Sequence, residues 1–124
     1  MKIKLKNFIL IFLLIVCSCD TFDSNKQLTG RYYLRHTKFG KSISYRVDDD
    51  GDYVELINGA FGPIGFDDKY IIVEKSRTEY LIIAAYKGMN YFPEKGILGP
   101  FSLSQFNQQK VKLKIRANFT INTD

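Results

Sequence analysis

The sequence predicts an α+β domain that is built mainly from an antiparallel β-sheet and carries one C-terminal helix. From Gly30 onward, short apolar and aromatic runs are separated by turn residues at spacings of about eight to twelve, which is typical of antiparallel strands. The chain also has ten Phe and eight Tyr residues, a composition that favours strands over helices. No internal repeat or linker interrupts the pattern, so residues 29–124 are predicted to form a single mostly-β domain.

The first three predicted strands form two consecutive hairpins. Residues 31–36 and 42–47 make the first hairpin, and the tight-turn signal Asp50-Gly51 leads into a third strand at residues 53–57. Asn58-Gly59 ends that strand. Apolar and polar residues alternate strictly in the second strand, so we expect it to be buried on one face only. Its apolar face would consist of Ile43, Tyr45 and Val47, and its polar face of Ser42, Ser44 and Arg46.

The centre of the core is predicted to come from the next two strands. Residues 69–74 and 79–86 are apolar on both faces, as expected of strands that are covered on each side. Residues 76–78 would form the turn between them. Residues 93–96 are expected to close the strand region before the pattern changes at Gly99-Pro100.

A helix is predicted from Leu103 to about Leu113. Ser102 and Gln105 have the spacing of a capping box, in which both side chains bind free backbone N–H groups at a helix start. Residues 110–116 also alternate with a period of two, so a shorter helix followed by a strand stays open. Residues 117–121 would be a final strand or an extended segment on the sheet. The apolar helix face would consist of Leu103, Phe106 and Leu113.

Residues 1–18 have the organisation of a signal peptide of the lipoprotein type. A basic start is followed by an apolar run at residues 8–16, which is too short for a bilayer core that requires about 20 residues. Small Ser18 precedes Cys19 in a segment that resembles a lipobox, and we predict that Cys19 is lipidated. Cys17 is the alternative site, because it follows Leu14-Ile15-Val16 but has no small residue before it.

Residues 19–28 are predicted to be the lipidated cysteine and a flexible tether. Residues 20–27 are polar and offer little surface to bury. Because two acyl chains give stable anchoring where one does not, the domain should stay on its membrane. The expected location is the cell envelope, at the outer membrane or the extracellular face. Asp20 resembles residues that sort lipoproteins between membranes, although sorting rules differ among bacterial groups.

Charge argues against a nucleic-acid partner. The formal net charge of +5 includes three lysines of the leader, and removing residues 1–18 leaves 15 basic and 13 acidic residues, a net charge of +2. Binding to nucleic acid usually needs a much more basic surface. The predicted partners are therefore the membrane, through the lipid, and an envelope protein or glycan.

No catalytic, cofactor-binding or metal site is predicted. The cluster at residues 48–52 attracts attention because calcium prefers carboxylates, but an EF-hand register on Gly51 would place Arg46 and Ile57 at ligand positions. We interpret the cluster as an acidic hairpin tip. The only histidine, His36, is interpreted as a strand residue, so no histidine-based triad can form. Carboxylates that folding could pair for glycan hydrolysis are Glu55, Asp67, Asp68, Glu74 and Glu79.

Two sets of residues are candidates for binding. The basic stripe could engage an anionic glycan, a lipid headgroup or an acidic partner, or it could be a solvated strand edge or helix face. Exposed tyrosines such as Tyr32 or Tyr33 and Tyr91 could line an interaction surface. The stripe consists of Lys110, Lys112, Lys114 and Arg116.

Four segments together resemble a family of small bacterial lipoproteins, catalogued as domain of unknown function 3997. They are residues 30–34, 64–73, 80–83 and 99–106, which cover much of the predicted mature domain. The resemblance implies an envelope location and an uncharacterised role, and it brings no catalytic or binding residues. The predicted function is a non-enzymatic binding or interaction module. The alternatives are a small envelope hydrolase that uses a carboxylate pair and an inhibitor or immunity-type protein.

Overall fold

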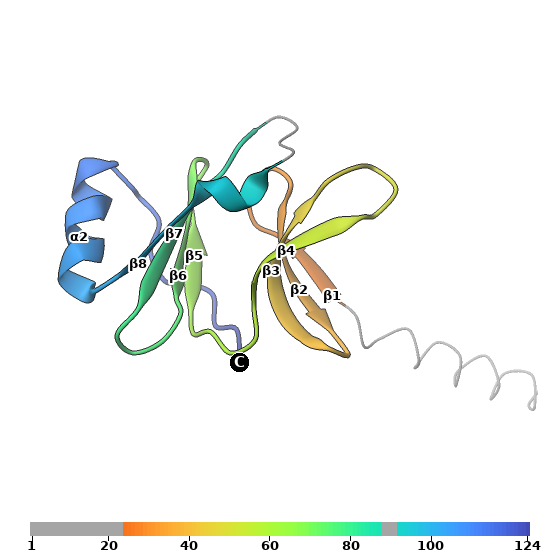
Figure 1. Ribbon diagram of the computed structural model, residues 1–124, viewed down its shortest axis with the longest axis horizontal. Helices are drawn as coiled ribbons and strands as arrows, with labels where there is room; N and C mark the ends of the chain where they lie inside the picture. The colour runs from red at the N-terminus through yellow and green to blue at the C-terminus, as the bar shows by residue number, and fades with distance from the viewer. Residues whose placement is uncertain (1–23, 88–91) are drawn as a thin grey trace, which may run out of the picture.

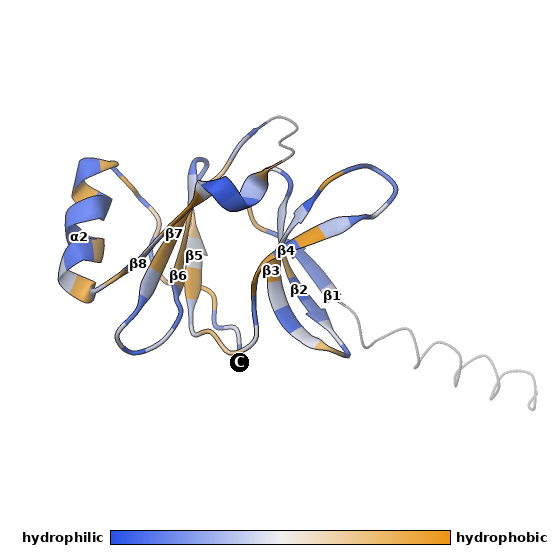
Figure 2. Cartoon of the chain, viewed as in Figure 1, coloured by the Kyte–Doolittle hydropathy of each residue, from blue (hydrophilic) through white to orange (hydrophobic). Residues whose placement is uncertain are grey.

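The computed structural model describes residues 24–87 and 92–124, which form three layers. Two four-stranded antiparallel sheets lie face to face, and helix α2 (Leu103–Lys112) covers the other side of the second sheet (Figure 1). Apolar residues concentrate in the strands of the second sheet, whereas α2 is mostly hydrophilic (Figure 2). The predicted α+β class, mainly antiparallel with one C-terminal helix, is confirmed.

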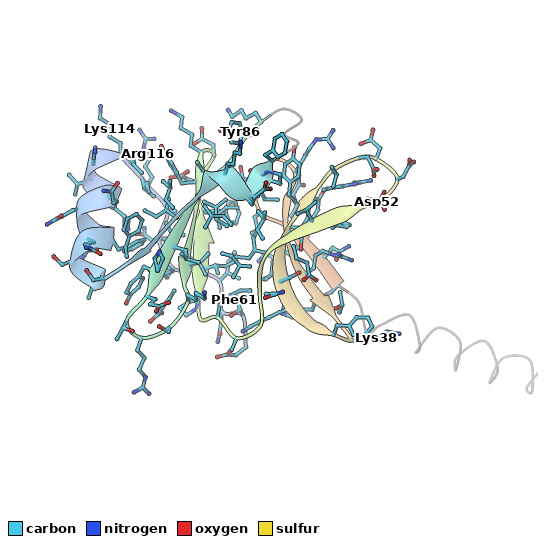
Figure 3. All side chains as sticks on the ribbon, viewed as in Figure 1. Lys38, Asp52, Phe61, Tyr86, Lys114 and Arg116 are labelled. Carbon is cyan, nitrogen blue, oxygen red and sulfur yellow. The ribbon has the colours of Figure 1, made fainter. Side chains whose placement is uncertain are left out.

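The first sheet has its four strands in the order of the sequence, β1-β2-β3-β4. The two predicted hairpins are confirmed, since β2 pairs with β3 and β3 with β4. The β2–β3 turn, which contains Lys38, and the β3–β4 turn, which contains Asp52, lie at opposite ends of the sheet (Figure 3). The strands are β1 (Ser24–Gln27), β2 (Tyr32–Thr37), β3 (Gly40–Arg46) and β4 (Tyr53–Asn58).

Strand β1 corrects the prediction of a flexible tether through residue 28. Residues 24–27 pair with β2, from Ser24 opposite His36 to Gln27 opposite Tyr33. All four residues of β1 are exposed, so backbone pairing to the edge of β2 holds the strand, and it has no apolar pattern by which the sequence could reveal it.

Strand β3 is buried on both faces, contrary to the predicted half-buried strand. Ile43 and Tyr45 enter the core, but Ser42 and Ser44 on the other face are also buried, and their hydroxyl oxygens lie 2.8 Å apart. The reason is that long side chains from the neighbouring strands β2 and β4 meet over β3. Val47, expected on the apolar face, lies just beyond the end of the strand.

The second sheet has the order β5-β6-β7-β8, and its two central strands are those predicted. A 3₁₀-helix, η2 (Pro93–Gly96), precedes β8. The prediction that the strand region ends at residues 93–96 is wrong, because β8 contains Gly99-Pro100 at the edge of the sheet. Its pairing with β7 is irregular there, and an edge strand can lack the N–H that proline removes. The strands are β5 (Ile64–Phe66), β6 (Tyr70–Glu74), β7 (Tyr80–Ala84) and β8 (Ile97–Phe101).

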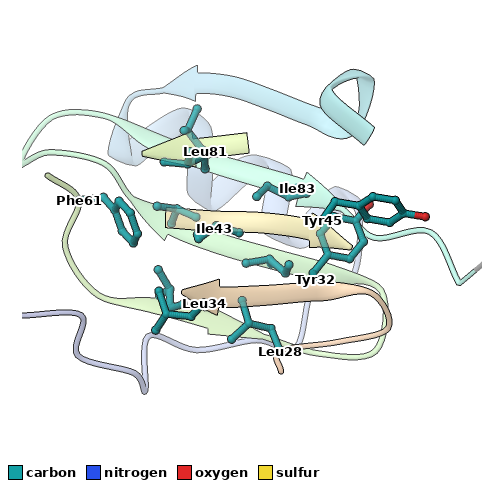
Figure 4. Packing of buried hydrophobic residues seen from close by; sticks show 12 residues of the cluster. Leu28, Tyr32, Leu34, Ile43, Tyr45, Phe61, Leu81 and Ile83 are labelled. Atoms are coloured by element: carbon teal, nitrogen blue, oxygen red, sulfur yellow. The ribbon is translucent and has the colours of Figure 1, made fainter. Parts of the chain in front are cut away.

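Two apolar clusters join the layers. The larger cluster fills the space between the sheets, where Leu34, Ile43 and Tyr45 of the first sheet pack with Leu81 and Ile83 of the second (Figure 4). The smaller cluster lies between the second sheet and α2 with the segment that follows it. Its members include Ile72, Tyr80, Ile82, Phe106, Ile115 and Ala117.

Helix α2 begins with the predicted capping box. The Ser102 hydroxyl accepts from the Gln105 backbone N–H at 3.2 Å, and the Gln105 side chain accepts from the Ser102 N–H at 3.0 Å. The prediction of an apolar helix face is wrong at Leu103, which is 55% exposed. Within the helix only Phe106 is buried. The helix ends at Lys112, and residues 113–116 form no strand, so the alternative of a shorter helix followed by a strand is wrong.

The chain after α2 returns along β5 as an extended segment, one of the two predicted alternatives. Ile64 and Ile121 form an isolated bridge, in which each backbone N–H donates to the other residue's carbonyl at 2.9 Å. The two backbones are also in close contact at the next residue of β5, because a Cβ atom added to Gly65 would lie 1.8 Å from the Asn118 carbonyl oxygen. This segment therefore closes the free edge of β5.

Lys41 ties the first sheet to the connection between β4 and β5 and to the C-terminal segment. Its Nζ atom donates to the Phe61 carbonyl at 2.7 Å and to the Thr123 hydroxyl at 2.9 Å. It also lies 3.4 Å from the Asp124 carboxylate. Thr123 is itself buried, and its hydroxyl proton is shared between the Phe61 and Gly62 carbonyls, whose oxygens lie 2.9 and 2.7 Å from its Oγ1 atom. The ammonium group thus connects β3 with two segments that lie far from it in the sequence.

Candidate functional site

The outer face of the first sheet carries an organised set of aromatic and arginine side chains. The Arg35 guanidinium of β2 lies 4.0 Å from the centroid of the Tyr53 ring of β4, so these side chains meet across β3. Tyr33 contacts the same ring edge-on, with the centroids 5.7 Å apart. Arg35 also donates through Nε to the Asn25 side chain of β1 at 3.1 Å. We call Tyr33, Arg35, Arg46 and Tyr53 the Tyr–Arg face.

Arg46 is held in place at the end of this face. It donates to the Asp48 carbonyl at 3.0 Å through Nε and to the Asp49 carbonyl at 2.9 Å through Nη2. A side-chain hydrogen bond with Tyr33 raises the pKa of Arg46 above its ordinary value, so the guanidinium is charged at any physiological pH. The face therefore presents fixed positive charge beside aromatic rings.

The tip of the β2–β3 hairpin presents an exposed phenylalanine beside a lysine. Phe39 is 90% exposed, and the Nζ atom of Lys38 lies 5.2 Å from the centroid of its ring (Lys38 is labelled in Figure 3). The Thr37 hydroxyl accepts from the Phe39 N–H and donates to the Gly40 carbonyl, both at 3.2 Å. Gly40 has φ +117°, a backbone conformation that glycine adopts at little steric cost. These bonds give the tip a defined shape.

The acidic cluster at residues 48–52 forms the tip of the β3–β4 hairpin, as interpreted from the sequence. The Asp48 carboxylate accepts from the backbone N–H groups of Asp52 and Asp50, which lower its pKa below the ordinary value. Within residues 24–87 and 92–124, no three His, Cys, Asp or Glu side chains gather as a metal-binding group would.

The carboxylates considered for hydrolysis are distributed over both sheets. Glu55 lies on β4, whereas Glu74 and Glu79 lie at the β6–β7 end of the second sheet. Asp67 has a structural role, since its two oxygens accept four backbone N–H groups. Partial burial acts to raise its pKa, but these four bonds lower it overall. The donors are Lys69, Tyr70, Arg116 and Ala117.

The basic stripe is divided between the helix end and the segment after it. Lys110, Lys114 and Arg116 line an open depression of about 510 Å³ together with Asn107, whereas Lys112 does not contribute to it. Lys114 has φ +56° and forms a left-handed helix cap in which the Ile115 N–H donates to the Lys110 carbonyl. The stripe is thus a solvated surface at the C-terminal end of α2.

The remaining candidate residues differ in their placement. His36 lies in β2, as interpreted. Tyr32 is fully buried, burial raises the pKa of its hydroxyl, and the hydroxyl donates to the Ala84 carbonyl, so of the two candidate tyrosines of β2 it is Tyr33 that lies on a surface. Cys17, Cys19 and Tyr91 lie outside the described residues.

Comparison of the chain with protein-family models, curated proteins and solved structures finds no match. The resemblance to the lipoprotein family therefore stays a prediction. Among the described helices, none has the length and hydropathy to span a bilayer.

Two features of the surface were missed by sequence reasoning. The contact of Arg35 with Tyr53 depends on the register of the three paired strands, which the sequence does not specify. The sequence does contain a signal for the exposure of Phe39, because this large apolar residue stands between Lys38 and Gly40 in a turn.

Proposed function

We propose that the protein is a lipoprotein of the bacterial cell envelope, anchored through Cys19, and that it acts there as a non-enzymatic binding module. The leader and the lipobox-like segment before Cys19 support the anchor. The described domain starts at Ser24, only five residues after that cysteine, so the module would be held close to its membrane.

The Tyr–Arg face is the observation that supports a binding role. Its rings and guanidinium groups are already packed against one another, so little side-chain entropy is lost when a partner binds. Tyrosine and arginine are also the residue types that most often dominate binding energy. Aromatic rings and arginine suit the apolar faces and hydroxyls of an envelope glycan, and the same surface could take a protein partner.

Intact mass spectrometry of the membrane-extracted protein tests the anchor. We expect a chain that starts at residue 19 with acyl groups attached, and a Cys19→Ala variant should lose both the cleavage and the lipid. The Cys17→Ala variant is the matched control and should be processed like the wild type. An unmodified chain, or a modification lost only in Cys17→Ala, would contradict the assignment of Cys19.

Co-sedimentation with purified envelope glycan tests the binding role. A Tyr53→Ala variant should bind at least about tenfold more weakly, because removing a central interface tyrosine commonly costs about 1.4 kcal/mol or more. Tyr86→Ala is the control, since Tyr86 is 52% exposed and belongs to the chain beyond β7, not to the strands that carry the Tyr–Arg face. Equal binding by the wild type and both variants would rule out the Tyr–Arg face as the glycan site.

A further inference from the structure

The tip of the β2–β3 hairpin lies at the same end of the first sheet as the start of β1. Ser24, the first residue of β1, is paired directly with His36, which precedes Phe39 by three residues. Figure 1 shows this shared end of the sheet, at the lower right, where β1 begins. A membrane that anchors the chain just before Ser24 would therefore lie close to the tip.

Chain length places the proposed lipid site within reach of this end. Cys19 precedes Ser24 by five residues, and such a stretch spans at most about 18 Å when fully extended. A bilayer that holds the acyl chains of Cys19 would then lie close to the end of the sheet that carries Lys38 and Phe39. The acidic β3–β4 tip lies at the opposite end.

Basic and acidic residues are unevenly distributed over the first sheet. Residues 24–47 contain six basic residues and no acidic one, whereas residues 48–52 at the opposite tip contain four Asp. Two of the basic residues, Arg31 and Arg46, lie beside that acidic tip, where Arg31 is 3.9 Å from the Asp49 carboxylate and Arg46 donates to the Asp48 and Asp49 carbonyls. Lys41 is already bound to the Phe61 carbonyl and Thr123, so Lys38 is the lysine that the tip itself presents. The six basic residues are Lys26, Arg31, Arg35, Lys38, Lys41 and Arg46.

We propose that the Lys38–Phe39 tip inserts into the surface of the bilayer that holds the Cys19 lipid, with Phe39 among the acyl chains and Lys38 at anionic headgroups. The inference rests on the proposed anchor and adds an orientation to it. An exposed aromatic ring on a hydrogen-bonded turn gains from leaving water, and a neighbouring ammonium group gains from anionic headgroups. The anchor and the inserted tip would together fix the orientation of the first sheet on the membrane, with the acidic tip directed away from the bilayer.

Tryptophan fluorescence provides a direct test, because the chain contains no tryptophan. The lipidated full-length Phe39→Trp variant is reconstituted into vesicles of phosphatidylethanolamine and phosphatidylglycerol, with or without bromine on the acyl chains. We expect emission at shorter wavelength than in water and strong quenching by the brominated chains. The control is Val111→Trp, since Val111 is 80% exposed on α2, far from β1 (Figure 1), and should show neither effect.

The same samples separate the two proposals. Intact mass first establishes whether Cys19 carries lipid, and an unlipidated chain would overturn the anchor and the insertion together. If the lipid is present and the Phe39→Trp variant is quenched no more than Val111→Trp, the anchor stands and the insertion is wrong. Quenching of the Phe39→Trp variant alone supports insertion of the tip.

Discussion

The Gly65→Ala variant is expected to lose about 3 kcal/mol or more of its free energy of unfolding, at the upper end of what overpacking usually costs. The added Cβ atom would lie 1.8 Å from the Asn118 carbonyl oxygen, and both groups belong to backbones that are held by hydrogen bonds. The C-terminal segment must therefore leave β5, and the two bonds between Ile64 and Ile121 are lost with it. Urea denaturation of the purified protein measures the change.

Gly59→Ala is the matched control for this variant. Gly59 has φ +83° and nothing lies within 4 Å of an added Cβ, so it isolates backbone strain from steric overlap. Its cost should be about 1 kcal/mol. If Gly65→Ala proves no more destabilising than Gly59→Ala, the C-terminal segment does not lie against β5 in solution.

The Asp67→Asn variant should lose about 2–3 kcal/mol of stability at pH 7, although it is nearly isosteric. Oδ1 accepts from the Lys69 and Tyr70 N–H groups, and Oδ2 accepts from those of Arg116 and Ala117. An amide keeps only one of the two oxygens, so its NH₂ group must face two N–H donors. The bonds of Oδ2 also join sequence positions about 50 residues apart, and their loss frees the chain after α2 from the β5–β6 turn.

The loss should depend on pH in a defined direction. The folded pKa of Asp67 lies below the unfolded value of about 3.9, so its stabilisation is complete above that pH and disappears as the pH falls through the folded pKa. The gap in stability between the wild type and Asp67→Asn should therefore shrink from pH 7 to pH 3. Asp68→Asn, a change at the exposed neighbour, is the control, and a gap that does not change with pH would contradict this account.

The parts of the fold that the sequence predicts are those with local signals. Asp50-Gly51 and Asn58-Gly59 mark the ends of β4, and Ser102 with Gln105 marks the start of α2, because these residues fix backbone geometry within a few positions. The central strands β6 and β7 are evident because both of their faces are apolar.

The parts that it does not predict depend on partners far away in the sequence. Strand β1 is polar throughout and exists because the edge of β2 is free to pair with it. Strand β8 tolerates Pro100 because it lies at an edge of the sheet. The burial of Ser44 and the Tyr–Arg face both require β2, β3 and β4 to be in register, and periodicity within one strand cannot show this.

The order of the strands also has a consequence for biogenesis. Each sheet is a meander of consecutive strands, so a chain that emerges from its N-terminus can complete the hydrogen bonds of the first sheet before the second has appeared. The apolar inner face of that first sheet is then exposed to water until the second sheet packs against it. Lys41 can make its final bonds only when Thr123, 82 positions later, has arrived. A nascent intermediate with an uncovered sheet is thus built into the topology, and it is the species that a holding chaperone would recognise.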